Sequence, residues 1–430
     1  MVNMPYFGIG KAGNLEPAKG LRATVAGRLW RQCAARFTFA FINFNSHSAM
    51  TKPIILFRLA AGLAAGCLSL AACANPYFDA SLPHHTEVGF RNPVLESAPR
   101  SLGELIRWRW GVLVGDLPPA AQTPTPTVAA DLPRIRSYQR SAPDSTAARS
   151  ASSPAVTWIG HASTLVQAGG LNVLTDPIFS ERAFPVQIAG PQRAQPPGVA
   201  VDDLPPIDVV IISHNHYDHL DRASVVALNA KAQLDGSNTL FLVPLGQKPW
   251  FKDQGITHVV ELDWWQMHTV RGVEFFLTPV QHWSARGVFD QNHTLWGGWA
   301  VFAADLHWYF GGDAGYSADF ADTRRRFADR QTQQLGGGFD LALLPVGAYA
   351  PRWFMGTHHI NPEEALQAHL DLNAKRSVAV HWGTFALTDE ALDQPPKDLL
   401  SARAAKGLSD KDFALFKIGE TRSMPVRSIP

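Results

Sequence analysis

The residues best suited to chemistry lie in one stretch of the chain, SHNHYDHLD. His214, His216, Asp218 and His219 offer the imidazole and carboxylate groups that bind borderline divalent metals in proteins. They directly follow the apolar run at residues 209–212, so we expect them in a loop at the carboxyl end of a buried strand. The first two histidines can point to one metal there, and the Asp-His pair to a second metal close by. A solvated histidine-rich turn is the alternative, but this many ligand-type side chains favour a metal site.

The composition of the chain limits the kinds of site and partner. The 430 residues carry a formal net charge of +1 and are 46% hydrophobic, which is enough for one large core or two modest ones. This charge balance gives no sign of a nucleic-acid partner. Cys33, Cys67 and Cys73 are the three cysteines, so the rest of the chain has no disulfide framework and no thiolate metal site. A metal bound there must use His, Asp or Glu.

A targeting signal is expected at residues 50–73. Its apolar run is followed by small residues and then Cys73, which is typical of a secretory signal. The ending LAAC resembles the bacterial lipobox, which implies cleavage before Cys73 and lipidation of its sulfur. A transmembrane anchor is the alternative, but the run is barely long enough to span and carries Arg58. Because Met50 stands where a signal should begin, we expect residues 1–49 to be an extension from a misplaced start codon or a segment without a fold.

The lipoprotein resemblance also implies a location. Ala74 follows Cys73, so the Asp that retains lipoproteins at the inner membrane is missing. We therefore expect an outer-membrane lipoprotein of the cell envelope that faces the periplasm. Its acyl chains would hold the protein at a membrane surface.

The rest of the chain divides into an extension, residues 74–154, and a main domain, residues 155–430. Residues 116–154 are rich in Pro, Ala, Thr and Ser, which predicts an extended linker or long loop. In the main domain, apolar runs of strand length alternate with helical patterns. The expected strands are residues 156–159, 171–174, 208–212, 239–244, 273–278, 299–303, 308–310, 341–346 and 377–380. The expected helices of the main domain are residues 222–231, 318–330 and 362–372, and a short helix is expected at residues 101–114 of the extension. This order favours sheets packed face to face with helices outside, as an α/β or α+β fold.

The motif His-x-His-x-Asp-His resembles the signature of the metallo-β-lactamase superfamily, and the resemblance extends from about Trp158 to Phe385. It implies an α+β fold, the four-layer αβ/βα sandwich, and three more ligands: His282 in TPVQHWS, Asp313 in YFGGDAGYS and His381 in SVAVHWGTF. The implied first metal is bound by His214, His216 and His282. The implied second metal is bound by Asp218, His219 and His381, and Asp313 bridges the two.

These ligand types favour two Zn²⁺ ions, although iron and manganese are also compatible with them. Two neighbouring metals lower the pKa of a shared water and stabilise the oxyanion of an in-line displacement. The resemblance therefore implies a hydrolase in which a metal-bound hydroxide attacks the substrate.

The flanking sequence resembles one branch, the N-acyl-phosphatidylethanolamine-hydrolysing phospholipase D family with its bacterial lipoprotein members. The resemblance covers about residues 75–385 apart from the Pro-rich linker, and it rests on TWIGHASTLVQAGG, LTDPIFSERAFPVQIAGPQR, LWGGWAV, GGDAGY and HHINPEEAL. It implies a zinc-dependent phosphodiesterase that converts N-acyl-phosphatidylethanolamine, or a related phospholipid, to phosphatidic acid and an N-acylethanolamine. It also implies a phospholipid substrate at a membrane surface and, as in the mammalian relative, a homodimer.

Further residues follow from the same resemblance. Asp218 and Asp313 are expected to be catalytic through the metals, and His359 matches a histidine that assists the phosphate or leaving group. The alternative for His359 is a surface histidine beside a helix start. His358 stands where the mammalian enzyme has Gln, and His161 is expected to support the metal ligands. The side chains that either line an acyl path or pack in the core are Trp264, Trp265 and Trp283.

Two other functions remain open at this stage. The same hydroxide would serve a lactonase or β-lactamase-like hydrolase that attacks a carbonyl. A non-enzymatic envelope lipoprotein with a vestigial metal site is the third reading, and the complete ligand set argues against it.

Overall fold

The computed structural model describes residues 74–94, 102–113, 120–140, 150–287, 289–331 and 337–427. Tyr77–Pro430 form one compact unit, and Met1–Pro76 form another. The expected N-terminal extension and the expected signal with Cys73 lie outside the described residues. Within the described ranges, no helix combines the length and the apolar character needed to cross a membrane.

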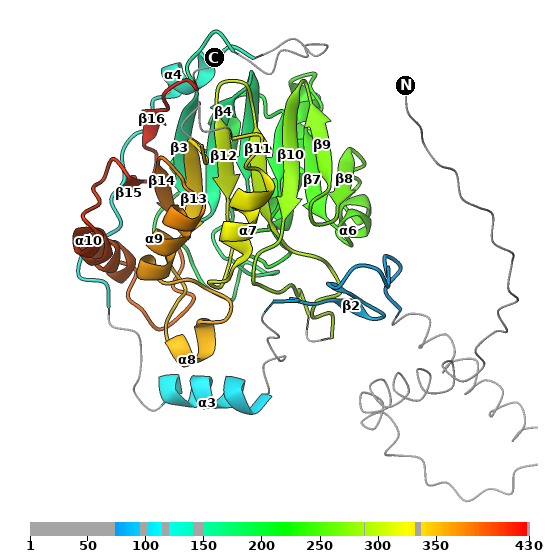
Figure 1. Ribbon diagram of the computed structural model, residues 1–430, viewed down its shortest axis with the longest axis vertical. Coiled ribbons are helices and arrows are strands. Elements are labelled where there is room, and N and C mark those ends of the chain that lie inside the picture. Colours follow the sequence, from blue (N-terminus) through cyan, green and yellow to red (C-terminus); the bar gives the residue numbers. More distant parts are fainter. Residues whose placement is uncertain are drawn as a thin grey trace, which may run out of the picture. The chain divides into compact units, whose positions relative to one another are not determined.

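Two mixed β-sheets, each with seven strands in the described part of the chain, form the centre of the second unit (Figure 1). In the first sheet β3, β4 and β5 are antiparallel, and β5 to β8 are parallel. Its strands, in spatial order, are β16 (Thr421–Ser423), β3 (Ala155–Gly160), β4 (Ser163–Ala168), β5 (Leu171–Thr175), β6 (Val209–Ile211), β7 (Leu240–Pro244) and β8 (Val259–Leu262).

The second sheet repeats this plan. Strands β9 to β12 are antiparallel, and β12 to β15 are parallel. Its strands, in spatial order, are β15 (Phe413–Ala414), β14 (Ser377–Val380), β13 (Leu341–Pro345), β12 (His307–Phe310), β11 (Gly298–Phe302), β10 (Val273–Thr278) and β9 (Met267–Val270).

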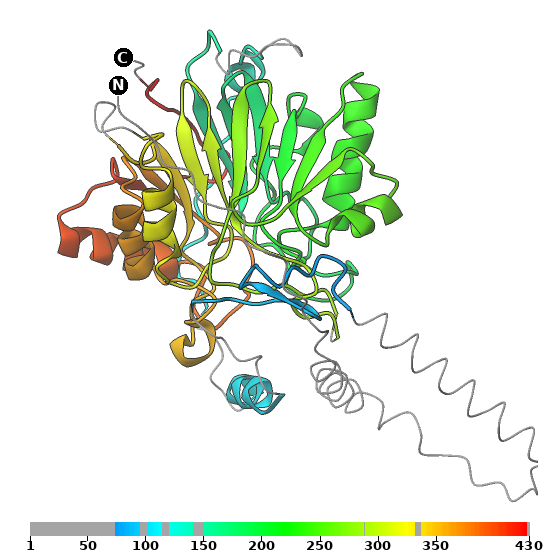
Figure 2. The same ribbon diagram turned by 45° about the vertical axis from the view of Figure 1, so that its right-hand side comes forward.

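Helices cover the outer faces of both sheets, as Figure 2 shows. Helices α5 (Arg222–Leu234) and α6 (Lys248–Asp253) cover the first sheet, and α7 (Asp319–Arg326), α9 (Pro362–Asp371) and α10 (Gln394–Lys406) cover the second. The result is the expected α+β sandwich of four layers. The remaining named elements are β1 (His85–Thr86), β2 (Gly89–Phe90), α3 (Leu102–Leu113), α4 (Leu132–Arg136), η1 (Val201–Asp203) and α8 (Arg352–Met355).

Strand β6 explains why its sequence is a continuous apolar run. Val209 and Ile211 pack into the core between the sheets, while Val210 and Ile212 pack into the cluster that includes α5. A strand buried on both faces needs apolar residues at every position, whereas a half-exposed strand alternates. The expected strands and helices are all present, with small shifts at their ends.

The Pro-rich segment differs from the expected linker where it is described. Ile135 is buried, and the Gly170 amide donates to the Tyr138 hydroxyl. Thr125 donates its hydroxyl to the carbonyl of Gly383. Residues 120–140 therefore pack along the sandwich, because a few apolar and hydroxyl side chains suffice to hold an irregular segment against it.

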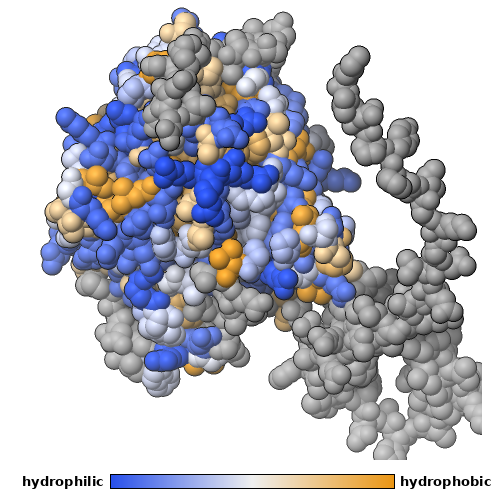
Figure 3. Space-filling view, viewed as in Figure 1, coloured by the Kyte–Doolittle hydropathy of each residue, from blue (hydrophilic) through white to orange (hydrophobic). Residues whose placement is uncertain are grey.

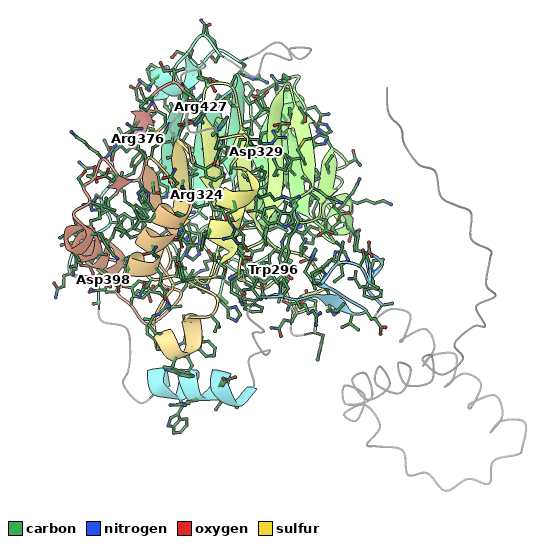
Figure 4. The ribbon with its side chains drawn as sticks, in the orientation of Figure 1. Trp296, Arg324, Asp329, Arg376, Asp398 and Arg427 are labelled. Carbon is green, nitrogen blue, oxygen red and sulfur yellow. The ribbon has the colours of Figure 1, made fainter. Side chains whose placement is uncertain are left out.

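The parallel strands of the second sheet all end at the same end of the sandwich. Figure 4 places Arg427 at the upper end and Trp296 at the lower end. Arg427 pairs with Asp340, which directly precedes β13, so this strand runs downward from there. Asp313 and His381 follow β12 and β14 at the lower end, just as His214 follows β6 of the first sheet.

Gly312 lies where the loops after β12 and β6 touch. Its φ is +57°, and a Cβ at this position would lie 2.4 Å from the Cβ of Ser213. Only glycine fits both the backbone conformation and the space. The loops of the two sheets therefore touch here, where the backbone of Gly312 packs against the side chain of Ser213. This contact lies beside His214 and Asp313.

Changing Gly312 to Ala is expected to destabilise the fold by about 2–3 kcal/mol, because the new methyl group overlaps Ser213 and the positive φ disfavours it. Gly311→Ala is the matched control, since its Cβ would come no closer than 3.3 Å to Pro345. Urea denaturation of both variants measures the difference, and metal content reports on the loops. Equal midpoints for the two variants would contradict this packing.

Candidate metal centre

Three histidines from both sheets converge at the lower end. His214 Nε2 lies 2.8 Å from His216 Nδ1, which lies 3.4 Å from His282 Nε2. Nitrogen ligands of a tetrahedral zinc are about 3.3 Å apart, given metal–nitrogen distances of 2.0–2.1 Å. The three ring nitrogens are therefore grouped as they would be around one metal ion.

A second group lies next to the first. The Nε2 atoms of His219 and His381 are each 3.3 Å from Asp218 Oδ2. Asp313 lies between the groups: its carboxylate oxygens are 3.1 Å from His219 Nε2 and from His381 Nε2. On its other side, Asp313 Oδ2 is 3.8 Å from His214 Nε2 and 3.9 Å from His282 Nε2. The structure thus brings together all seven ligand candidates, and Asp313 has the position of a bridge.

The charge of this centre fits metal cations. Within the described residues, every ion-pair partner of Asp218 and Asp313 is a histidine, and neither carboxylate pairs with lysine or arginine. Burial lowers the pKa of His216 to about 4 and, with neighbouring histidines, lowers that of His214 well below its ordinary value. These imidazoles are therefore neutral at neutral pH. Two buried carboxylates are costly, because a protonated His219 can balance only one of their charges, and divalent metals would balance both.

The histidine His219 shows how strongly these carboxylates attract positive charge. Burial lowers the pKa of His219, but Asp313 and Asp218 raise it well above its ordinary value. The pKa values of Asp218 and Asp313, which burial raises, are held well below their ordinary range by His219. Both carboxylates are therefore ionised at neutral pH.

Hydrogen bonds fix which ring nitrogens carry the protons. The Ser213 hydroxyl donates to Asp176, so His214 Nδ1–H must donate to Ser213 Oγ, 2.8 Å away. His282 Nδ1 donates to the carbonyl of His358 at 2.9 Å. Each remaining Nε2 therefore turns a lone pair toward the centre, as a metal ligand requires.

Asp176 is a functional residue that the sequence pattern did not single out. It accepts from His219 Nδ1 at 2.7 Å as well as from the amide and hydroxyl of Ser213. It is fully buried and has a φ of +31°, a strained conformation that places the carboxylate between the two ligand loops. Its signal in the sequence was its position directly after β5, just as His214 lies three residues after the end of β6.

Arg286 holds the ligand loop from the side. One guanidinium nitrogen donates to the carbonyls of Asn215 and Leu220, at 2.9 and 2.8 Å, which flank the loop. The guanidinium carbon lies 4.1 Å from the ring centroid of Tyr217, whose hydroxyl donates back to the Arg286 carbonyl. Arg286 therefore holds the loop between His216 and His219 through backbone carbonyls, and among the described residues it makes no hydrogen bond or ion pair with a candidate ligand.

Other predicted residues occupy supporting positions. His161 Nε2 lies 2.9 Å from Asp218 Oδ2, as expected for a support, and it belongs to a group that could itself hold a metal. His359 Nδ1 lies 3.9 Å from Asp313 Oδ2, so it faces the centre and is not a surface residue. His358 contributes its carbonyl to His282. Asp221 caps helix α5 by accepting from the Ser224 amide.

Of the three tryptophans proposed to line an acyl path, only Trp283 contacts the centre. Its ring centroid is 4.4 Å from that of His216. Trp264 stacks on His84 and donates to the carbonyl of Trp296, and Trp265 packs on Phe327. These two have the core role.

The extension before the main domain reaches the centre. Residues 77–94, which we call the strap, run to Asn92, whose side-chain amide donates to the carbonyl of His282 at 2.8 Å and accepts from its amide at 3.4 Å. Two histidines hold the strap in place: His84 Nε2 and His85 Nε2 bond the two oxygens of Asp263, at 2.7 and 2.9 Å. His84, His85 and Asp263 could hold a metal, but these direct hydrogen bonds already satisfy the group.

Comparisons with known proteins agree with this site. A family model described as "Beta-lactamase superfamily domain" matches residues 171–382, which include all seven ligand candidates. The chain is 39% identical over 281 residues to the N-acyl-phosphatidylethanolamine-hydrolyzing phospholipase D 1 of Caenorhabditis elegans, a match that covers 61% of this chain and 74% of that protein.

Two further relatives are matched over less of their length. The chain is 42% identical over 257 residues to an uncharacterized protein of Mycobacterium tuberculosis, covering 59% of this chain and 64% of that protein. It is 34% identical over 266 residues to the mitochondrial N-acyl-phosphatidylethanolamine-hydrolyzing phospholipase D of Saccharomyces cerevisiae, covering 60% of this chain and 53% of that protein. The chain therefore spans under two thirds of the length of these two relatives.

Changing Asp176 to Asn is expected to weaken metal binding roughly 10–100-fold, because the amide cannot accept from both His219 and Ser213. Asp221→Asn is the matched control, since it changes a buried aspartate of the same region that contacts no ligand. Competition with a chelator of known affinity measures the dissociation constants. Equal constants for the two variants would show that Asp176 does not orient the ligands.

Changing Asn92 to Ala is expected to weaken metal binding roughly tenfold, because the backbone on both sides of His282 loses its partner. Arg91→Ala is the control, since the Arg91 side chain donates within the strap, to the carbonyl of Pro83, and to no other described residue. Metal titration of both apo-proteins checks this, with circular dichroism to confirm folding. An Asn92 variant that binds metal like the Arg91 variant would rule out the role of the strap.

Proposed function

Because the chain belongs to the metallo-β-lactamase superfamily and is related to an N-acyl-phosphatidylethanolamine-hydrolysing phospholipase D, we propose that it is a dinuclear zinc-dependent phosphodiesterase. Its substrate is N-acyl-phosphatidylethanolamine or a related phospholipid, and its products are phosphatidic acid and an N-acylethanolamine. The observation that carries the proposal is the pair of ligand groups that share Asp313. The worm and yeast relatives support the choice of substrate.

The residues that would hold the two metals follow from the two groups. The first group is His214, His216 and His282; the second is Asp218, His219 and His381; and Asp313 belongs to both. Two bound zinc ions would supply Lewis acidity and lower the pKa of a water molecule between them. Asp218 and Asp313 would place negative charge beside both metals. The ligands are kept oriented because His214 donates to the Ser213 hydroxyl, His282 donates to the His358 carbonyl, and His161 bonds Asp218.

His359 has the position of a residue that acts on the substrate. Burial lowers its pKa to about 4, so its ring is neutral at neutral pH. Its Nδ1 is buried, faces Asp313 and makes no hydrogen bond to the described residues. A neutral ring has one N–H, which can donate to a phosphoryl oxygen or to the leaving oxygen as charge develops there.

The location and assembly belong to the same proposal. We infer that the protein is an outer-membrane lipoprotein, anchored through Cys73 on the periplasmic side, where its phospholipid substrate is found. This inference rests on the LAAC sequence and the apolar run before it. The proposed oligomer is a homodimer, which light scattering of the purified protein measures.

The purified zinc-loaded protein is expected to hydrolyse N-acyl-phosphatidylethanolamine in ¹⁸O-labelled water with the label entering phosphatidic acid, because attack occurs at phosphorus. Mass spectrometry of the products locates the label. Parallel assays with a lactone and a β-lactam test the carbonyl hydrolase, whose products would carry the label in a carboxylate. No turnover on any of these substrates by a protein with two bound zinc ions would favour the non-catalytic lipoprotein.

Changing Asp313 to Asn provides the inactive reference, with a rate lowered by at least about 10³-fold because the shared carboxylate is lost. Asp319→Asn is its control, since this buried carboxyl contacts Ser317 and no ligand. Zinc content is measured for both variants. An undiminished rate in the Asp313 variant would refute the proposed mechanism.

A further inference from the structure

Exposed apolar side chains gather on the segments that surround the metal centre. Ile188 is 91% exposed, Phe289 is 68% exposed and Trp353 is 48% exposed. Single exposed apolar residues are normal in proteins, but a group of large ones around one site indicates an interaction surface. The members of this group, which we call the apolar rim, are Ile106, Trp110, Phe184, Ile188, Phe289 and Trp353.

Contacts tie three segments of the rim, those of Phe184, Phe289 and Trp353, to the centre. The ring of Phe184 lies 6.1 Å from that of Tyr217, in the ligand loop between His216 and Asp218. Phe289 lies in the loop that Arg286 begins, where Asp290 accepts from the Arg286 amide. Trp353 belongs to α8, and the carbonyl of Met355 at the end of this helix accepts from the amides of His358 and His359.

Helix α3 adds two more residues to the rim. Its Trp108 stacks on Phe354 of α8 at 4.8 Å and donates to Asp389, and Arg107 lies 4.7 Å above the ring of Trp353. Ile106 and Trp110 are left 56% and 62% exposed. Figures 1 and 2 place α3 and α8 side by side at the same end of the sandwich as β2.

The side of the sandwich has a different character. Figure 3 shows that the face seen in Figure 1 is mostly hydrophilic, with apolar residues in small separate patches. Exposed large apolar residues also occur outside the rim, for example Leu234, Leu400 and Val426, but on the face seen in Figure 3 apolar residues form only small separate patches.

We propose that the apolar rim inserts into the surface of a phospholipid bilayer and holds the metal centre against it. This inference rests on the proposed function, because it names the surface through which that site meets its substrate. Trp and Phe are favourable at the boundary between headgroups and acyl chains, and burying each removes a large apolar area from water. Arg107 beside Trp353 adds a cation suited to lipid phosphates.

The part of the chain that precedes Tyr77 favours a bilayer over a second protein as the partner of the apolar rim. Cys73, the proposed site of lipidation, precedes Tyr77 by four residues, a distance of at most about 14 Å along the chain. The strap begins at Tyr77 and ends on His282 through Asn92. An acyl anchor at Cys73 would therefore keep the strap, and with it the metal end of the sandwich, close to the membrane.

Single cysteines test the docking surface in the full chain. The natural cysteines are Cys33, Cys67 and Cys73, so a cysteine introduced at Ile188 or Phe289 gives a new labelling site in the catalytic unit. Leu234→Cys is the matched control: Leu234 is 88% exposed and ends α5, which starts beside the centre and extends about 20 Å from it. Each variant carries an environment-sensitive fluorophore, and the labelled unsubstituted chain gives the blank.

Vesicles of phosphatidylethanolamine and phosphatidylglycerol are expected to shift the emission at positions 188 and 289 to the blue and to leave position 234 unchanged. No shift at the rim, or an equal shift at Leu234, would overturn the proposal. A shift that appears on raising the protein concentration without vesicles would identify a second copy of the chain as the occupant and would overturn it as well.

A second set of variants separates docking from catalysis. Ile188→Asp and Phe289→Asp are expected to lower hydrolysis of vesicle phospholipid roughly tenfold relative to Leu234→Asp, with hydrolysis of a soluble short-chain analogue unchanged. Blue shifts without any hydrolysis by the unsubstituted protein would keep the docking surface and refute the proposed function. Equal rates of vesicle-lipid hydrolysis in all three variants would support the proposed function and refute the docking surface.

Discussion

Two buried carboxylates constrain everything around them. Asp218 and Asp313 lie where the two sheets meet, and within the described chain only histidines pair with them. Neutral imidazoles such as His214 and His216 cannot compensate their charge, and a protonated His219 balances only one of the two carboxylates. The centre is therefore suited to binding cations. The fold must hold the ligand loops close together although two metal ions bound there would repel each other.

Neither half of the sandwich holds this centre alone. The loop after β6 supplies four ligand candidates, and the second sheet supplies His282, Asp313 and His381 after β10, β12 and β14. The halves join at Ser213, whose carbonyl accepts from the Gly297 amide and whose side chain leaves room only for Gly312. Asp176 orients ligands of the first half through hydrogen bonds to Ser213 and His219. A change that disturbs the packing between the two sheets is therefore expected to disturb the positions of the ligands as well.

The sequence predicted what depends on local pattern. Apolar runs predicted most of the doubly buried strands but not β4, whose buried sequence STLVQA mixes polar with apolar residues. The predicted helix at residues 362–372 begins after Asn361, which forms a capping box with Glu364. Strand β9 was missed because its side chains are exposed or half-buried, so no apolar run marks it. The ligands after β10, β12 and β14 were located through a family resemblance. Asp176, Asn92 and Arg286 were missed because their roles depend on contacts with residues far away in the chain, which spacing cannot reveal.

The strap has a consequence for how the centre is oriented. It precedes the matched family domain, which starts at residue 171, yet it belongs to the same compact unit and bonds the backbone of His282. A flexible linker between an anchor and a domain would let the domain turn freely. Here the chain becomes fixed at Tyr77, which donates to Glu261, and at the two histidines on Asp263. A tether at Cys73 would therefore act on the metal centre through a short and ordered segment, and the direction in which the centre faces would be set by the strap.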